Sequence, residues 1–266
     1  MIEKITSPAN ARIKKIIKLK TNNHFRQQEE IFVIEGFREI YRAILSGIRV
    51  QEIYVCNELD TDNSLRQILE IDENINIVEI SESVFAHVAY RETSDGLLAL
   101  AVPQRLPLTD VKLPKNPLIL VVEAVEKPGN LGAIMRTCDA AQVDAVIVCD
   151  PLTDIYNPNA IRAALGCMFS TQIVVASTFE AIKWLKDNNI NTYAAALTQT
   201  ALPYHRFDYT QPTAFVLGTE ATGLSDEWLR KAHQQVIIPM RGIADSLNVS
   251  ISAAVLVFEA VRQRQA

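Results

Sequence analysis

The second half of the chain alternates short apolar runs with segments of helical periodicity, and this alternation constrains the fold more than any other feature. Apolar runs at residues 118–122, 145–149 and 214–217 have the length and the β-branched composition of buried strands. A helical pattern follows the first of them, at residues 131–143. Strands that alternate with helices at this spacing predict an α/β fold, in which helices cover both faces of a parallel sheet.

A proline-rich segment separates this part from the N-terminal third. Residues 101–117 contain four prolines, which can continue neither a helix nor a central strand. We expect a linker here, and we divide the chain into residues 1–105 and 106–266. Strands predicted at residues 31–35 and 52–55, with a helix between them, indicate that the first part is a smaller α/β domain.

Composition and charge exclude several classes of protein. The chain is 48% hydrophobic and 21% charged, and it has no run of the roughly 20 apolar residues that a membrane span needs. We therefore expect a globular cytoplasmic protein that makes no membrane contact. The net charge of −5 argues against indiscriminate coating of nucleic acid, which requires phosphate neutralisation. Seven basic residues nevertheless precede position 27, with Glu3 as the single acid; they are Lys4, Arg12, Lys14, Lys15, Lys18, Lys20 and Arg26. We interpret them as a local positive arm, and the alternative is a solvated helix face.

Common cofactor and metal signatures are missing from the sequence. The four cysteines show no CxxC spacing and the four histidines are scattered, so we expect neither a metal site nor a disulfide. Neither GxGxxG nor GxxxxGK[ST] occurs. NAD enzymes, common Rossmann methyltransferases and P-loop NTPases would therefore lack the cradle for their ligands.

The loops that follow the predicted strands are the candidate ligand site, because parallel α/β sheets bind ligands at the carboxyl ends of their strands. In the first loop, Pro128 and Gly129 predict a turn, and Asn130 is predicted to cap the helix that carries Arg136. An ordinary capped helix with a surface arginine explains this loop equally well.

Two later loops carry polar residues beside apolar strand ends. Gly218 and Gly223 flank Glu220 after a buried strand, which suggests close approach of the backbone to a ligand or a tight turn. The third loop leads into the final apolar helix, with Ser246 and Asn248 as candidate caps. A cap accounts for one polar residue of this loop and not for all of them.

Taken together, the three loops resemble the motifs of a known family. The patterns Asn130-x-Gly-x-x-x-Arg136, Gly218-x-Glu220-x-x-Gly223 and Ile238-Pro-Met…Ser246-Leu-Asn-Val-Ser250 are similar, in this order, to the three motifs of the SpoU (TrmH-like) RNA 2′-O-ribose methyltransferases of the SPOUT superfamily. The resemblance covers roughly residues 118–264. The N-terminal third resembles the auxiliary substrate domain of the same family through Ser7-Pro-Ala-Asn10 and Ile34-Glu35-Gly36.

The resemblance implies an architecture and a set of site residues. It implies a C-terminal SPOUT α/β domain whose end threads a trefoil knot, a preceding small α/β domain that binds RNA, and a homodimer. The implied cofactor is S-adenosyl-L-methionine, held by Leu217, Gly218, Ile238, Met240, Ser246 and Leu247. The implied catalytic residues are Arg136, Asn130, Glu220 and Asn248. The candidate RNA contacts are Arg12, Lys14, Lys15 and Lys18.

We assign Arg136 to phosphate binding or to stabilisation of the developing alkoxide, although the family proposal makes this arginine the base. Arginine stays protonated in proteins, so it is poorly suited to accept a proton. The identity of the base remains open.

These inferences predict an S-adenosylmethionine-dependent RNA ribose 2′-O-methyltransferase that acts on ribosomal RNA. The alternatives are methylation of transfer RNA, a non-catalytic RNA-binding or ribosome-assembly protein with the same fold, and a small-molecule α/β enzyme. DNA is not an expected partner.

Overall fold

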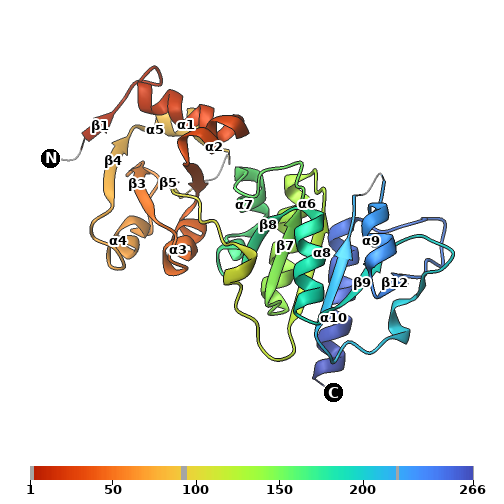
Figure 1. The fold of residues 1–266 in the computed structure, drawn as a ribbon. Helices are drawn as coiled ribbons and strands as arrows, with labels where there is room; N and C mark the ends of the chain where they lie inside the picture. Colours follow the sequence, from red (N-terminus) through yellow and green to blue (C-terminus); the bar gives the residue numbers. More distant parts are fainter. Residues whose placement is uncertain (1–2, 91–94, 220–221, 266) are drawn as a thin grey trace. The chain divides into compact units, whose positions relative to one another are not determined.

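The computed structural model describes residues 3–90, 95–219 and 222–265, and the chain forms two compact units (Figure 1). The first unit comprises Met1–Gln104 together with Asp154–Ser170, and the second comprises Arg105–Thr153 and Thr171–Ala266. Within the described ranges, no helix combines the length and the apolar character that a membrane span requires.

The first unit is built on a mixed five-stranded sheet. The sheet order is β1-β4-β3-β5-β2, and β5 runs antiparallel to both of its neighbours. In chain order, the elements are β1 (Glu3–Ile5), α1 (Ala11–Thr21), α2 (Asn23–Glu29), β2 (Phe32–Glu35), α3 (Phe37–Leu45), β3 (Val50–Val55), α4 (Ser64–Leu69), β4 (Asn76–Ile80), α5 (Glu82–Val88), β5 (Leu97–Ala101), α7 (Pro158–Ala164) and the 3₁₀ helix η2 (Cys167–Phe169). The predicted α/β character of this part is confirmed.

The basic N-terminal segment is a packed amphipathic helix and not a free arm. Asn10 caps α1 by accepting a hydrogen bond from the backbone N–H of Arg12 at 2.8 Å. Ile13, Ile16 and Leu19 recur at three-residue spacing and are fully buried in the core of this unit. The structure therefore agrees with the alternative interpretation, a helix with a solvated basic face.

A segment from later in the chain, Asp154–Ser170, completes the first unit. The guanidinium Nε of Arg26 donates to Asp154 Oδ2 at 2.6 Å, and both side chains are largely buried. The ring of Phe32 on β2 lies 4.4 Å from the ring of Tyr156, measured between centroids. The division of the chain at position 105 would assign residues 154–170 to the second part, but they pack with the first unit, because they cover the apolar side chain of Phe32.

The second unit contains a seven-stranded sheet of order β10-β12-β9-β11-β6-β7-β8, in which every paired neighbour is parallel. The predicted parallel sheet is confirmed. In chain order, the elements are η1 (Leu108–Asp110), β6 (Leu118–Glu123), α6 (Pro128–Ala140), β7 (Ala145–Cys149), β8 (Ile173–Ala176), α8 (Thr178–Asp187), β9 (Asn191–Ala195), β10 (Leu202–Pro203), η3 (Tyr204–Arg206), β11 (Thr213–Leu217), α9 (Asp226–Lys231), β12 (Gln234–Ile237) and α10 (Val249–Arg264).

Helices cover both faces of this sheet, which explains the uninterrupted apolar runs. Ile119 and Val121 of β6 share a core with Leu185 of α8 and Trp228 of α9. The alternate side chains of β6 point to the opposite face, where α10 packs against α6, β6 and β11. Since both faces are closed by helices, the loops at the carboxyl edge of the sheet are left to form a site.

Candidate functional site

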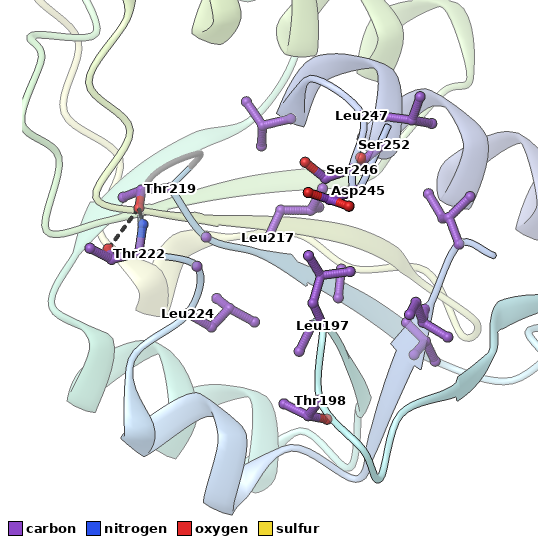
Figure 2. Close-up of a pocket in the computed structure, with 18 of the residues that line it drawn as sticks. Leu197, Thr198, Leu217, Thr219, Thr222, Leu224, Asp245, Ser246, Leu247 and Ser252 are labelled. Atoms are coloured by element: carbon purple, nitrogen blue, oxygen red, sulfur yellow. Dashed lines mark hydrogen bonds between the residues drawn. The ribbon is translucent and has the colours of Figure 1, made fainter. Parts of the chain in front are cut away.

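The loop after β11 is held in a tight conformation by its own hydrogen bonds. Leu217 ends the strand beside Val122 of β6. Thr219 and Gly223 then form an antiparallel bridge, with N–H···O distances of 3.1 and 3.2 Å. The Thr219 hydroxyl accepts a hydrogen bond from the N–H of Thr222 at 2.9 Å (Figure 2). These bonds fix the loop at the carboxyl edge of the sheet.

Glycine is required at position 218 by the closeness of the returning chain. A Cβ atom built on Gly218 would lie 2.2 Å from the carbonyl oxygen of Gly223, far inside van der Waals contact. Gly223 itself has a φ of +70°, which favours glycine. The close approach lies within the chain, as in the tight turn that was the alternative to close approach to a ligand.

We predict that Gly218→Ala lowers the affinity for S-adenosylmethionine by about tenfold or more, because the loop must move to accept a methyl group (tenfold is about 1.4 kcal/mol). Gly129→Ala is the matched control, since a Cβ there meets nothing within 4 Å. Calorimetric titration of both variants, with circular dichroism to verify folding, measures the effect. Equal affinities of the two folded variants would contradict this account of the loop.

A cavity of about 380 Å³ opens at this edge (Figure 2). Its walls come from the ends of β9, β11 and β12 and from the chain that leads into α10. The side chains are mostly aliphatic or small hydroxyls, and the volume is within the range of roughly 300–1,000 Å³ that is usual for small-molecule sites. The lining residues include Ala195, Leu197, Thr198, Thr219, Thr222, Leu224, Leu229, Val236, Asp245, Val249 and Ser252.

All six residues that the sequence proposed for cofactor binding also line this cavity. They are Leu217, Gly218, Ile238, Met240, Ser246 and Leu247. The wall formed by Leu197 and Thr198 was not anticipated, because no unusual motif follows β9. Only the position of β9 beside β11 in the sheet could have indicated it. Asp245 was also missed.

Two of the four proposed catalytic residues meet directly. The Asn248 side-chain amide donates to Asn130 Oδ1 at 3.1 Å. Asn248 also caps α10, because its Oδ1 accepts from the N–H of Ser250 at 2.9 Å. One residue thus joins the first motif to the third across 118 positions.

The start of α6 differs from the prediction. Asn130 was expected to cap this helix, but the helix begins two residues earlier, at Pro128, and Lys127 occupies the cap position. Proline suits the first turn because its fixed φ is helical and its missing N–H needs no partner there. Asn130 therefore lies within the first turn, where its side chain is available to Asn248.

Among the described residues, neither the Asn130–Asn248 pair nor Arg136 lines the cavity itself. Arg136 is exposed on α6, and no hydrogen bond or ion pair links its side chain to another described residue. Glu220 lies outside the described residues. The structure thus brings Asn130 and Asn248 together and leaves Arg136 at the surface of this chain.

A buried carboxylate at the end of β6 was overlooked in the sequence. Glu123 is 7% exposed and accepts hydrogen bonds from the N–H and hydroxyl of Ser225, both at 2.7 Å. It also accepts from the Thr178 hydroxyl at 2.9 Å. Glu123 thereby ties the loop after β11 and the start of α8 to β6. The sequence could have indicated this residue, because Glu123 is an acid at the end of an otherwise apolar strand.

The proposed RNA contacts lie on α1, and three of them already have partners. Arg12 Nη1 lies 3.1 Å from Glu3 and 3.4 Å from Glu52, and Lys15 lies 2.7 Å from Glu29. Lys18 Nζ lies 3.9 Å from the centre of the Phe25 ring, whereas Lys14 is exposed.

Two further basic residues of the N-terminal segment, Lys20 and Arg26, are buried and do not belong to its solvated face. Burial lowers the pKa of Lys20, and the nearby Glu35 opposes this change. Lys20 also lies 3.7 Å from the centre of the Tyr90 ring. Arg26 is only 3% exposed and is paired with Asp154. Both residues are part of the packing of the first unit.

Comparison with known families assigns both parts of the chain. Residues 117–258 match the SpoU rRNA Methylase family, and residues 10–99 match the MRM3-like substrate binding domain. The first match includes residues 154–170, which the structure groups with the first unit.

Individual relatives cover nearly the whole chain. A 23S rRNA (guanosine(2553)-2′-O)-methyltransferase of Bacillus subtilis is 31% identical over 97% of this chain and 98% of its own length. A crystal structure of an RNA 2′-O ribose methyltransferase is 39% identical, covers 99% of this chain and 100% of its own, and superposes with a TM-score of 0.84. An AdoMet-bound rRNA methyltransferase from Sinorhizobium meliloti is 26% identical, covers 98% of both chains and has a TM-score of 0.89.

Proposed function

The chain belongs to the SpoU rRNA methylase family, and we propose that it transfers a methyl group from S-adenosylmethionine to a ribose 2′-hydroxyl of RNA, with ribosomal RNA as the substrate class. One observation carries the proposal: the residues of the second and third motifs line one cavity, and Asn248 of the third motif binds Asn130 of the first.

Ribosomal RNA is favoured over transfer RNA by the extent of the resemblance. The Bacillus subtilis relative named for 23S rRNA matches over both parts of the chain. A Thermus thermophilus relative named for tRNA position 18 is 40% identical, but over only 55% of this chain. The match to the ribosomal relative therefore extends over residues 10–99, the range that matches the MRM3-like substrate binding domain. We also propose that the protein acts in the cytoplasm.

The cavity suits S-adenosylmethionine in size and in chemistry. Apolar strand ends and backbone groups around Leu217, Gly218 and Ile238 form a slot for an uncharged purine. Hydroxyls of Ser246 and Ser252 supply polar contacts for the sugar and amino-acid portions.

The proposed mechanism depends on alignment. Held by Leu217, Gly218 and Ile238, S-adenosylmethionine would supply a methyl group on a positively charged sulfur for transfer to the ribose oxygen, with the neutral thioether as the leaving group. Asn130 and Asn248, held together at 3.1 Å, position the ribose beside the cavity. Orientation of this kind contributes up to roughly 7–11 kcal/mol to catalysis. Arg136 binds a phosphate or stabilises the developing alkoxide, and Glu220 orients Asn130 or the arginine. The hydroxyl proton leaves to an RNA phosphate or to water.

We extend the proposal to the trefoil knot. β12 lies beside β9 and β10, whereas the next helix, α10, packs against β6, β11 and α6. Residues 238–248 must therefore cross the carboxyl edge of the sheet to connect them. This crossing beside the loop after β11 supports a threaded C-terminus.

A homodimer is the proposed assembly, and α10 is its proposed interface. Ile251 is 52% exposed and Phe258 is 46% exposed. They lie seven residues apart, so they share one face of the helix. Arg136 does not line the described cavity of its own chain, which supports a site that is completed by the arginine of a second subunit.

We predict that light scattering at micromolar concentration gives about twice the chain mass of 29.7 kDa. The double variant Ile251→Arg/Phe258→Arg is expected to be monomeric, because it places charges in the apolar face. Phe179→Arg is the control, since Phe179 is 76% exposed on α8 and away from that face. A monomeric wild-type protein, or a double variant that stays dimeric, would rule out this interface.

The decisive test of the function is a methylation assay. We expect purified protein and S-adenosylmethionine to methylate ribosomal RNA from a strain that lacks the gene, and primer extension at low nucleotide concentration to stop at a new 2′-O-methyl site. Binding of S-adenosylmethionine is measured separately by calorimetry. Cofactor binding with methylation of transfer RNA alone would establish the first alternative. Failure to bind the cofactor would favour a non-catalytic RNA-binding protein.

A further inference from the structure

Asp245 is the one charged side chain among the described residues that line the cavity. The other lining side chains are uncharged: they are aliphatic, hydroxyl-bearing, the thioether of Met240, or absent, as in glycine. Figure 2 draws the Asp245 carboxylate among these side chains, next to Ser246. A single negative charge in an otherwise neutral cavity makes the cavity selective for positively charged ligands.

The carboxylate is available to a ligand. Asp245 is exposed, and no ion pair or side-chain hydrogen bond links it to any other part of the chain that the structure describes. It lies in the crossing between β12 and α10, three residues before Asn248. Three residues span at most about 10 Å, so Asp245 is close to the Asn130–Asn248 pair, where the reacting groups meet in the proposed mechanism.

The proposed reaction changes the charge of the ligand by one unit. S-adenosylmethionine has a positive sulfonium, whereas the product S-adenosylhomocysteine has a neutral thioether in the same place. The adenosine, the α-ammonium and the α-carboxylate are common to both molecules. A group that distinguishes cofactor from product must therefore respond to the sulfonium or to the transferred methyl group.

We infer that Asp245 is a specificity-determining residue that makes the cavity prefer the sulfonium cofactor over its neutral thioether product, and so favours product release. This inference rests on the proposed function. An exposed carboxylate about 4 Å from a unit positive charge contributes about fivefold to affinity, which corresponds to about 1 kcal/mol. The same interaction must weaken as salt is added.

The test is the ratio of the two affinities, measured by calorimetry with S-adenosylmethionine and S-adenosylhomocysteine. Asp245→Asn is expected to weaken cofactor binding about fivefold and to leave product binding unchanged. Sinefungin, which has a protonated amine in place of the methylsulfonium, should lose affinity together with the cofactor. Asp245→Glu should keep the ratio. Asp187→Asn, an exposed acid of α8 that does not line the cavity, is the control.

The possible outcomes separate this inference from the function on which it rests. An unchanged ratio in Asp245→Asn would overturn the inference, and so would an equal loss for both ligands, since that places the carboxylate beside the shared ammonium. A cofactor-selective loss that disappears at high salt supports it. If the wild-type protein binds neither ligand, the proposed function itself fails.

Discussion

Replacing Arg136 with lysine is expected to slow methyl transfer by about a hundredfold or more while leaving the affinity for S-adenosylmethionine nearly unchanged. Lysine keeps the positive charge but loses the planar, forked donor group that binds a phosphate or a ribose oxygen in two places. The helix α6 gives this side chain a rigid support. Because the proposed mechanism assigns Arg136 to an RNA phosphate or to the developing alkoxide, and not to the cofactor, its loss should spare cofactor binding.

Single-turnover rates on the mapped RNA, with cofactor affinity measured by calorimetry, check this prediction. Arg230→Lys is the matched control, because Arg230 is an exposed arginine on α9 that pairs only with Glu227 at 2.7 Å among the described residues. A lysine variant with near-normal rate would indicate that charge alone is needed. Near-normal turnover by Arg136→Ala would remove this residue from the mechanism.

Replacing Arg26 with alanine is expected to lower the free energy of unfolding of the first unit by about 3–5 kcal/mol, because it leaves a largely buried charge without its partner. Arg26 donates to Asp154 at 2.6 Å and to the backbone oxygen of Leu19 at 2.7 Å. The substitution leaves both acceptors unsatisfied. Asp154 also begins the segment that covers β2, so the loss should loosen residues 154–170.

Urea denaturation, followed by tryptophan fluorescence and by circular dichroism, distinguishes destabilisation of the first unit from destabilisation of the second. Both tryptophans, Trp184 and Trp228, belong to the second unit, so their fluorescence follows that unit. Far-ultraviolet circular dichroism follows both units. Arg26→Ala should shift an early circular dichroism transition more than the fluorescence transition.

Two further variants control the interpretation. Arg230→Ala breaks an exposed ion pair and should change the unfolding free energy by less than about 1 kcal/mol. Asp154→Asn should also be destabilising, since it leaves the Arg26 charge unpaired. If Arg26→Ala lowers the free energy of unfolding by less than about 1 kcal/mol, the Arg26–Asp154 pair does not hold residues 154–170 in place.

The sequence by itself determined the parallel α/β architecture and the location of the site. Buried strands between two helical layers must be apolar along their whole length. Runs such as 118–122 and 145–149 can therefore be recognised as buried strands from their own residues. Ligand-binding loops follow the carboxyl ends of these strands for the same topological reason. The resemblance of the loop motifs to the SpoU family then assigned Gly218, Ile238 and Leu247 to the cofactor site, and all three line the cavity.

Tertiary structure alone decided the features that depend on distant partners. Residues 154–170 join the first unit because Arg26 and Phe32 present a charge and an apolar ring to them. Asn130 lies in the first turn of a helix that begins at Pro128, and only the fold brings Asn248, 118 positions away, to its side chain. Asp245 becomes the charged wall of the cavity only where the chain crosses the sheet edge. Periodicity reports which face of an element is buried, but it contains no information on which distant segment buries it.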